Sequence, residues 1–229
     1  MSTLLGQLRY GREGRGRAEL GELYGLRVLC CSADPEGWLG ERRLRKAGRA
    51  LRRGGALRML TPQGFSRWDL MGECGLAPVD PSPFLRAQSL PLALGALERQ
   101  GSAPDRASVA LRGLRADREM ARAAAALCPR VRHLVISAPR GGRELALWLR
   151  REFGLPVLPE SEEAQVALCF HPAGQGTERV KLELYGDTPD LAGLTLTAPA
   201  LAEADRSDLL LLTALWEGGR LGENGVKIT

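Results

Sequence analysis

The sequence predicts an α/β fold that is Rossmann-like in a loose sense, with a mainly parallel sheet, helices on both faces and two βαβ-rich halves. Two observations support this class. Short apolar runs alternate with amphipathic segments of helical period, which is the pattern of parallel strands joined by right-handed crossovers. One of these runs, 131–137, is apolar on both sides of its two-residue period, as a central strand covered by helices requires.

The length and composition of the chain are those of a globular protein. Its 229 residues are 44% hydrophobic and 26% charged, which suffices for one large domain or two small ones. The most apolar stretch, 209–216, falls far short of the roughly 20 residues of a membrane-spanning helix. The first residues lack the apolar core of a secretion signal. We therefore expect a soluble, cytoplasmic protein of bacterial type that has no membrane partner.

The first half of the chain is predicted from turn residues and apolar periodicity. Residues 1–25 hold six glycines and no sustained period, so we expect an irregular N-terminal arm. A first α/β half is predicted over 26–104 and a second over 105–229, with the boundary in the turn-rich stretch 100–105. The strands expected in the first half are 26–31 and 56–60. The expected helices are 38–53 and 84–100, of which Pro91 should kink or restart the second, and a short helix and loop are expected over 65–83.

The second half shows the same alternation more clearly. Asp117 is the expected N-cap of one helix, and Asp205 or Ser207 that of a buried terminal helix. The four tryptophans are expected to anchor the core, and the helix that follows Gly141 and Gly142 is expected to end at Gly154. The inner stripe of that helix is predicted to be Leu145, Trp148, Leu149 and Phe153, and the predicted strands are 108–112, 131–137, 155–158, 165–170, 179–185 and 194–197.

The first candidate binding site is the turn at 137–145, where a strand passes through two glycines into a helix. Backbone amides converge in such a turn, and a helix N-terminus favours anions. Glu160 stands 18 residues beyond Gly142, where a dinucleotide-binding unit places its ribose-binding carboxylate. The turn is not a GxGxxG motif, so a plain βα connection without a ligand stays open as the alternative. The candidate ligand-binding residues are Arg140, Gly141, Gly142, Arg143 and Glu160.

The second candidate is the helix at 38–53, which is densely cationic. Arginine matches phosphate geometry well, so this helix could contact a nucleic-acid backbone or an acidic partner. No aromatic residue interrupts the cationic cluster, and a solvated outer face in an Arg-rich protein is the plainer interpretation. The seven cations are Arg42, Arg43, Arg45, Lys46, Arg49, Arg52 and Arg53.

Cysteine and histidine offer little further chemistry. Five cysteines without a CxxC pair indicate reduced thiols rather than a disulfide framework. The only histidines are His133 and His171, both in predicted strands. His171 could form a metal-binding pair with Cys169, but no further ligand lies nearby in the sequence, so no metal site is expected.

These observations favour a protein that binds a nucleotide or another small phosphorylated ligand without catalysis. The alternative is an interaction protein whose basic helix engages nucleic acid or an acidic partner, with weak binding to nucleic acid. No constellation of residues supports a named reaction, and none identifies a cofactor.

Overall fold

The computed structural model describes residues 4–11, 16–154, 157–158, 164–172, 178–222 and 225–229. It confirms the predicted α/β class with mainly parallel sheets. The chain forms two compact units, one of Met1–Asp80 with Asp208–Gly222 and one of Pro81–Ser207 with Glu223–Thr229. The sequence instead places the boundary at 100–105, because the turn residues there resemble a linker. In the structure that stretch only joins two elements of the second unit.

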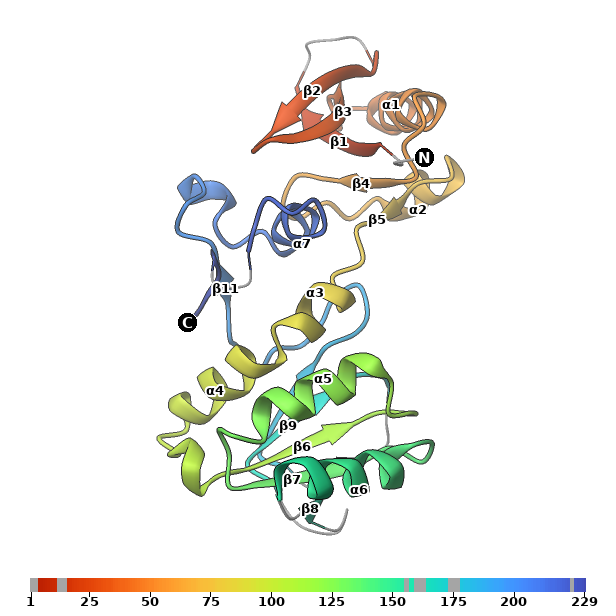
Figure 1. Cartoon of the computed structure of the whole chain (residues 1–229). Helices are drawn as coiled ribbons and strands as arrows, with labels where there is room; N and C mark the ends of the chain where they lie inside the picture. Colours follow the sequence, from red (N-terminus) through yellow and green to blue (C-terminus); the bar gives the residue numbers. More distant parts are fainter. Residues whose placement is uncertain (1–3, 12–15, 155–156, 159–163, 173–177, 223–224) are drawn as a thin grey trace. The chain divides into compact units, whose positions relative to one another are not determined.

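The first unit contains a five-stranded sheet with the order β2-β3-β1-β4-β5 (Figure 1). Strand β2 runs antiparallel to β3, and the other neighbours are parallel. Because β1 and β3 are parallel and in register, their carboxyl ends meet at one edge, with Tyr10 opposite Ala33. The strands are β1 (Leu5–Tyr10), β2 (Glu19–Leu23), β3 (Leu26–Ala33), β4 (Arg58–Leu60) and β5 (Ala77–Pro78).

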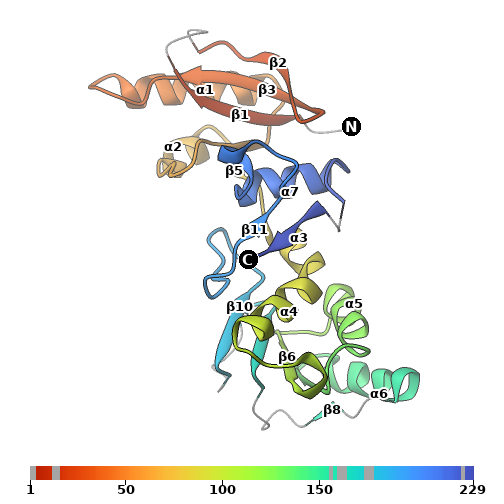
Figure 2. The same cartoon turned by 90° about the vertical axis from the view of Figure 1, so that its left-hand side faces the viewer.

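Helices cover both faces of this sheet (Figure 2). Helices α1 (Gly40–Arg53) and α2 (Trp68–Glu73) pack on the face that presents Leu29 and Cys31, in one buried apolar cluster. Helix α7 (Leu209–Glu217) ends beside Leu26, which alternates with Leu29 onto the opposite face. A Cβ added at Gly218 would lie 2.2 Å from a Leu26 methyl carbon, so a larger residue at this helix end would require the Leu26 side chain to move.

Two sequence-based expectations in this unit are wrong. The expected irregular arm contains β1 and β2, because β1 alternates buried Gly6 and Leu8 with polar residues in a strand too short to show its period. Helix α7 is capped by Asp208 rather than Asp205 or Ser207, since the Asp208 carboxylate accepts a hydrogen bond from the Leu211 amide at 3.0 Å.

The second unit contains a fully parallel sheet of order β10-β9-β6-β7-β8. The chain order reverses between β6 and β9, as it does between the two halves of a Rossmann fold. The predicted central strand is confirmed as interior and is buried at its centre. The strands are β6 (Ser108–Arg112), β7 (His133–Ser137), β8 (Val157–Leu158), β9 (Val166–Cys169) and β10 (Val180–Glu183), and β11 (Leu196–Thr197) pairs antiparallel with β12 (Lys227–Ile228).

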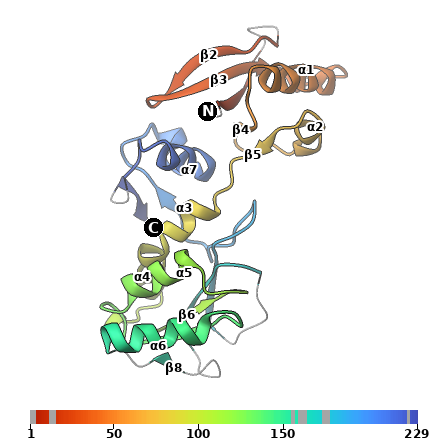
Figure 3. The ribbon, with the colours of Figure 1, turned by 45° about the vertical axis from the view of Figure 1, so that its right-hand side comes forward.

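Four helices of the second unit contact one another in turn (Figure 3). They are α3 (Ser82–Ala87), α4 (Ser89–Arg99), α5 (Arg118–Leu127) and α6 (Gly142–Phe153), and single 3-10 turns cover Pro104–Arg106 and Glu203–Asp205. The predicted restart is confirmed: the helix breaks at Gln88, which leaves Pro91 in the first turn of α4, where its missing N–H costs nothing. Asp117 caps α5 as predicted, accepting from the Met120 amide at 2.9 Å.

The expectation that all tryptophans anchor the core is wrong for two of them. Trp38 is 91% exposed in the loop before α1, and Trp148 is 42% exposed on α6, as is Phe153 at 45%. The inner stripe of α6 therefore reduces to Leu145 and Leu149. Within the described part of the chain, no helix combines the length and apolarity needed to cross a membrane.

Candidate functional site

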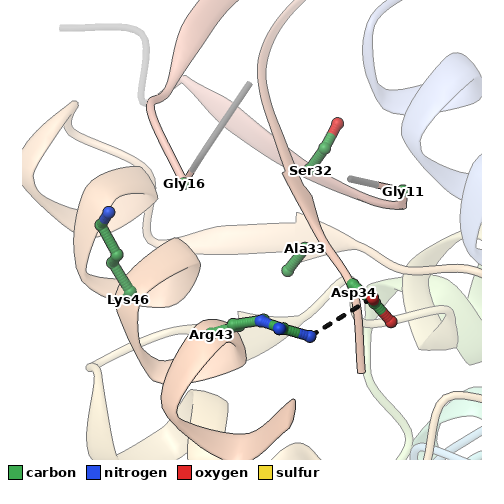
Figure 4. A pocket seen from close by; sticks show the side chains of 7 residues that line it. All are labelled: Gly11, Gly16, Ser32, Ala33, Asp34, Arg43 and Lys46. Atoms are coloured by element: carbon green, nitrogen blue, oxygen red, sulfur yellow. Dashed lines mark hydrogen bonds and ion pairs between the residues drawn. The ribbon is translucent and has the colours of Figure 1, made fainter. Parts of the chain in front are cut away.

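A cleft of about 640 Å³ opens at the carboxyl edge of the first unit's sheet (Figure 4). Two neighbouring parallel strands form one side of it, since Gly11 follows β1 while Ser32 and Ala33 end β3. The amide of Gly11 donates to the Ala33 carbonyl at 3.2 Å, which ties the two strand ends together. Asp34, Arg43, Lys46 and Gly16 complete the lining.

The loop between β3 and α1 is held by its own polar groups. The Asp34 carboxylate accepts from the Glu36 amide at 3.0 Å and from the Arg43 guanidinium at 3.3 Å. Arg43 also donates to the Glu36 carbonyl at 3.4 Å. A Cβ added at Gly40 would lie 1.9 Å from the Pro35 carbonyl oxygen, so glycine is required where α1 begins. The loop is therefore fixed against the helix that carries the cleft's cations.

Lys46 lies one helical turn beyond Arg43 and faces the same cleft. Its aliphatic chain passes Gly16, where an added Cβ would be 3.2 Å from the lysine Cδ. The charge of Lys46 also acts on the neighbouring Cys31 thiol. Burial raises the pKa of Cys31, and the Lys46 ammonium opposes that rise. The cleft thus combines cations on one wall with glycines and a carboxylate on the other.

Trp38 stands on the fixed loop, between Asp34 and Arg43 along the chain. An aromatic ring that is 91% exposed contributes little to folding and offers a face for a flat ligand. Tyr10, the last residue of β1, is also 48% exposed at this edge. The sequence does not reveal either aromatic side chain as exposed: Trp38 begins a predicted helix and is expected in the core, and Tyr10 lies in a segment without a clear period.

A sequence signal for the cleft does exist. Glycines recur at 11, 14 and 16, directly after β1, and Asp34 follows the adjacent parallel strand. A glycine-rich segment after one strand and an acidic residue after its neighbour is the order found in dinucleotide-binding units. Here the intervening element is the antiparallel strand β2 rather than a helix, so the motif does not stand out from the sequence.

The seven predicted cations of α1 do not all face the same part of the protein. Arg43 and Lys46 line the cleft, and Arg45 is engaged by Glu41 and Glu73 at 3.4 and 2.9 Å. Arg52 lies beside Gly75. A second hollow of about 390 Å³ is lined along the helix by Arg42, Arg45, Lys46, Arg49 and Arg53.

The predicted glycine turn lies in the second unit, after β7. Gly141 has φ +77° and precedes α6, while a Cβ on Gly142 would approach Ala138 Cβ to 3.2 Å. The Gly142 amide already donates a hydrogen bond to the Ala138 carbonyl. The backbone carbonyl of Arg140 accepts a hydrogen bond from the Ala116 amide at 2.8 Å. Arg143 lines a separate hollow of about 500 Å³ along α6 and β8. Glu160 lies outside the described residues, so the grouping of these five residues stays a prediction.

At the point where strand order reverses in the second unit, the protein's own side chains occupy the strand ends. A Cβ added at Gly113 would lie 2.8 Å from His171 Nδ1, so the imidazole covers the first turn after β6. His171 is 3.6 Å from Asp117. Arg112 donates from Nε to the buried Glu178 carboxylate at 2.6 Å. Among the described residues no group of three or more metal-ligating side chains gathers, and His171 lies beyond the end of β9.

Comparison with known proteins identifies no family. No family model and no curated protein matches the chain. Among solved structures, L-tryptophan dehydrogenase from Nostoc punctiforme is similar over 63% of this chain, at 21% identity and a TM-score of 0.32. This chain covers 44% of that structure, which is less than half of its length. The evidence for a function therefore lies in the residues of the cleft itself.

Proposed function

We propose that this protein binds a small phosphorylated ligand, specifically a nucleotide, in the cleft at the carboxyl edge of the first unit. One observation carries the proposal: Lys46 and Arg43 extend from α1 into a cleft of about 640 Å³ that parallel strand ends line on the other side. Pockets for small molecules commonly measure about 300–1,000 Å³, and open α/β sheets bind ligands at this edge.

Each part of a nucleotide has a counterpart among the described residues. The Lys46 ammonium supplies a charge for a phosphate, and Ser32 adds a hydroxyl donor. An added Cβ at Gly11 would meet nothing within 4 Å, so a ligand can approach the backbone there. The Asp34 carboxylate lines the same cleft and is the acceptor proposed for a ribose hydroxyl. Trp38 lies on the adjoining loop, outside the residues that line the cleft, and its exposed ring is the proposed stacking face for a base.

A thermal-shift screen tests the proposal. Inorganic phosphate, pyrophosphate and mononucleotides are compared with uncharged nucleosides, and a ligand at ten times its Kd should raise the melting temperature by about 5 °C. Lys46→Met keeps the aliphatic stem against Gly16 but removes the charge, so the shift should fall to about a third or less of the wild-type value. Arg49→Met, which removes a cation of the same helix outside the cleft, should leave the shift unchanged. The absence of a shift with every phosphate would refute the proposal.

The second hollow on α1 favours a second candidate function, which is sequence-independent binding of nucleic acid. Its five lining residues are all cations and repeat along one side of the helix. A paired Arg42→Gln and Arg49→Gln variant should reduce the affinity for duplex and single-stranded oligonucleotides while leaving nucleotide binding in the cleft intact. Titrations at two salt concentrations separate the outcomes, because a backbone contact weakens steeply with salt. Equal binding by the variant and the wild type would exclude this role for α1.

A further inference from the structure

Helix α6 exposes large apolar side chains on its outer side. Leu147 is 56% exposed and Trp148 42% exposed, although the inner stripe of Leu145 and Leu149 already supplies the packing against the sheet. The Trp148 ring is held edge-to-face against Phe153, with 5.8 Å between ring centroids. Neighbouring exposed apolar side chains on a helix whose core face is complete form the kind of patch that contacts another molecule.

The sequence of this outer stripe is complementary to itself. Glu144, Leu147, Trp148 and Arg151 recur at helical spacing and lie along one side of α6. If two α6 helices cross antiparallel about a two-fold axis between positions 147 and 148, each Leu147 meets the partner's Trp148. The same register sets each Glu144 opposite the partner's Arg151. Every contact is then made twice, as an isologous interface requires.

We propose that α6 is the contact surface of a homodimer, with a second copy of this chain as the occupant. All four residues of the stripe are exposed, and the structure shows no ion pair of Glu144 or Arg151 with another described residue. Opposite charges at the two ends of one stripe match a reversed copy of that stripe better than a uniformly charged partner. A single helix pair is small for an interface, so the dimer is a reversible one that depends on concentration.

Sedimentation of the full chain over a concentration series tests the dimer. The wild type should shift from monomer to dimer between about 1 μM and several hundred micromolar. Arg151→Glu sets two carboxylates opposite each other at both ends of the interface and should weaken dimerisation at least about tenfold. Adding Glu144→Arg to that variant restores opposite charges and should recover the wild-type dissociation constant to within about threefold.

Arg150→Glu is the matched control, because it makes the same change of charge on the neighbouring residue, about 100° around the helix from Arg151. It should dimerise like the wild type. Thermal melting of each variant verifies folding, since all these positions are exposed. The proposal is overturned by a monomer at every concentration, by Arg151→Glu dimerising as the wild type does, by a double variant that stays weak, or by equal weakening in Arg150→Glu.

Discussion

Arg43 reaches back from α1 to Asp34, with 3.3 Å between guanidinium nitrogen and carboxylate oxygen, and thereby closes the loop that carries Trp38. A partly exposed pair of this kind adds little to stability, on the order of 0–1 kcal/mol. The pair instead fixes the position of the loop. Because the same guanidinium also donates to the Glu36 carbonyl, the chain between β3 and α1 is held in one conformation beside the cleft. A loop that is ordered in advance costs a ligand less entropy on binding.

Replacing Trp38 separates base binding from phosphate binding. Trp38→Ala should lower the affinity for mononucleotides about tenfold, since stacking on an aromatic ring contributes about 1–3 kcal/mol per base. The affinity for pyrophosphate should stay unchanged, because the charges of the cleft remain. Trp38→Phe should recover part of the loss. Calorimetric titration provides the constants, and equal weakening for nucleotides and pyrophosphate would show that Trp38 shapes the loop rather than contacts a base.

Gly40 tests whether the tight start of α1 is required. An alanine methyl group would lie 1.9 Å from the Pro35 carbonyl oxygen, so Gly40→Ala should lower the free energy of unfolding by at least about 1–3 kcal/mol. Gly72→Ala is the control, since an added Cβ there meets nothing within 4 Å inside α2. That change should be neutral or stabilise by up to about 1 kcal/mol. Urea unfolding measures both, and a neutral Gly40→Ala would contradict the loop geometry.

Ile136 tests the interior strand of the second unit. Its side chain is 6% exposed in β7, so Ile136→Asp would bury a charge without a partner and should destabilise by more than about 3 kcal/mol. Leu114→Asp introduces the same charge at a residue that is 57% exposed and should change stability by less than about 0.5 kcal/mol. Thermal melting compares the two. Ile136→Asp protein with an unchanged melting temperature would refute the buried strand.

His171 predicts a dependence of stability on pH. Burial lowers the pKa of His171 below its ordinary value of 6.5, Arg86 and Arg115 lower it further, and the carboxylates of Asp117 and Glu119 oppose them. The folded state therefore binds the proton less readily than the unfolded chain, so stability falls as the pH drops below about 6.5.

Urea midpoints between about pH 7.5 and pH 5.5 measure this effect. His171→Gln should show a flatter decline than the wild type, while His133→Gln controls for the removal of an imidazole. A decline that is as steep in His171→Gln as in the wild type would assign it to other groups.

Much of the fold follows from periodic apolar spacing. Leu44, Ala47 and Leu51 predict α1 because their spacing creates a buried stripe, and both ends of that helix are marked by glycine. Strand β1 could not be predicted in this way. Its polar side chains form hydrogen bonds with each other, such as the one that Arg9 donates to the Gln7 side-chain oxygen at 3.0 Å. The sequence alone does not show these hydrogen bonds.

The candidate site could be predicted only in part. The abundance of cations on α1 is visible in the sequence, but which of them face a cleft depends on the register of β3 against β1. The contribution of Gly11 and Asp34 depends on the same pairing, since 22 residues separate them along the chain. Trp38 was placed in the core because exposure cannot be inferred for one aromatic residue in a short loop.

The most direct test of the central claim is a calorimetric titration of one mononucleotide, chosen by the thermal-shift screen, against three proteins. These are the wild type, Lys46→Met in the cleft and Arg143→Met beside the glycine turn of the second unit. The cleft predicts one site per chain, a loss of affinity of at least about tenfold in Lys46→Met and an unchanged constant in Arg143→Met. Binding that survives in Lys46→Met and is lost in Arg143→Met would contradict the cleft and assign the ligand to the glycine turn.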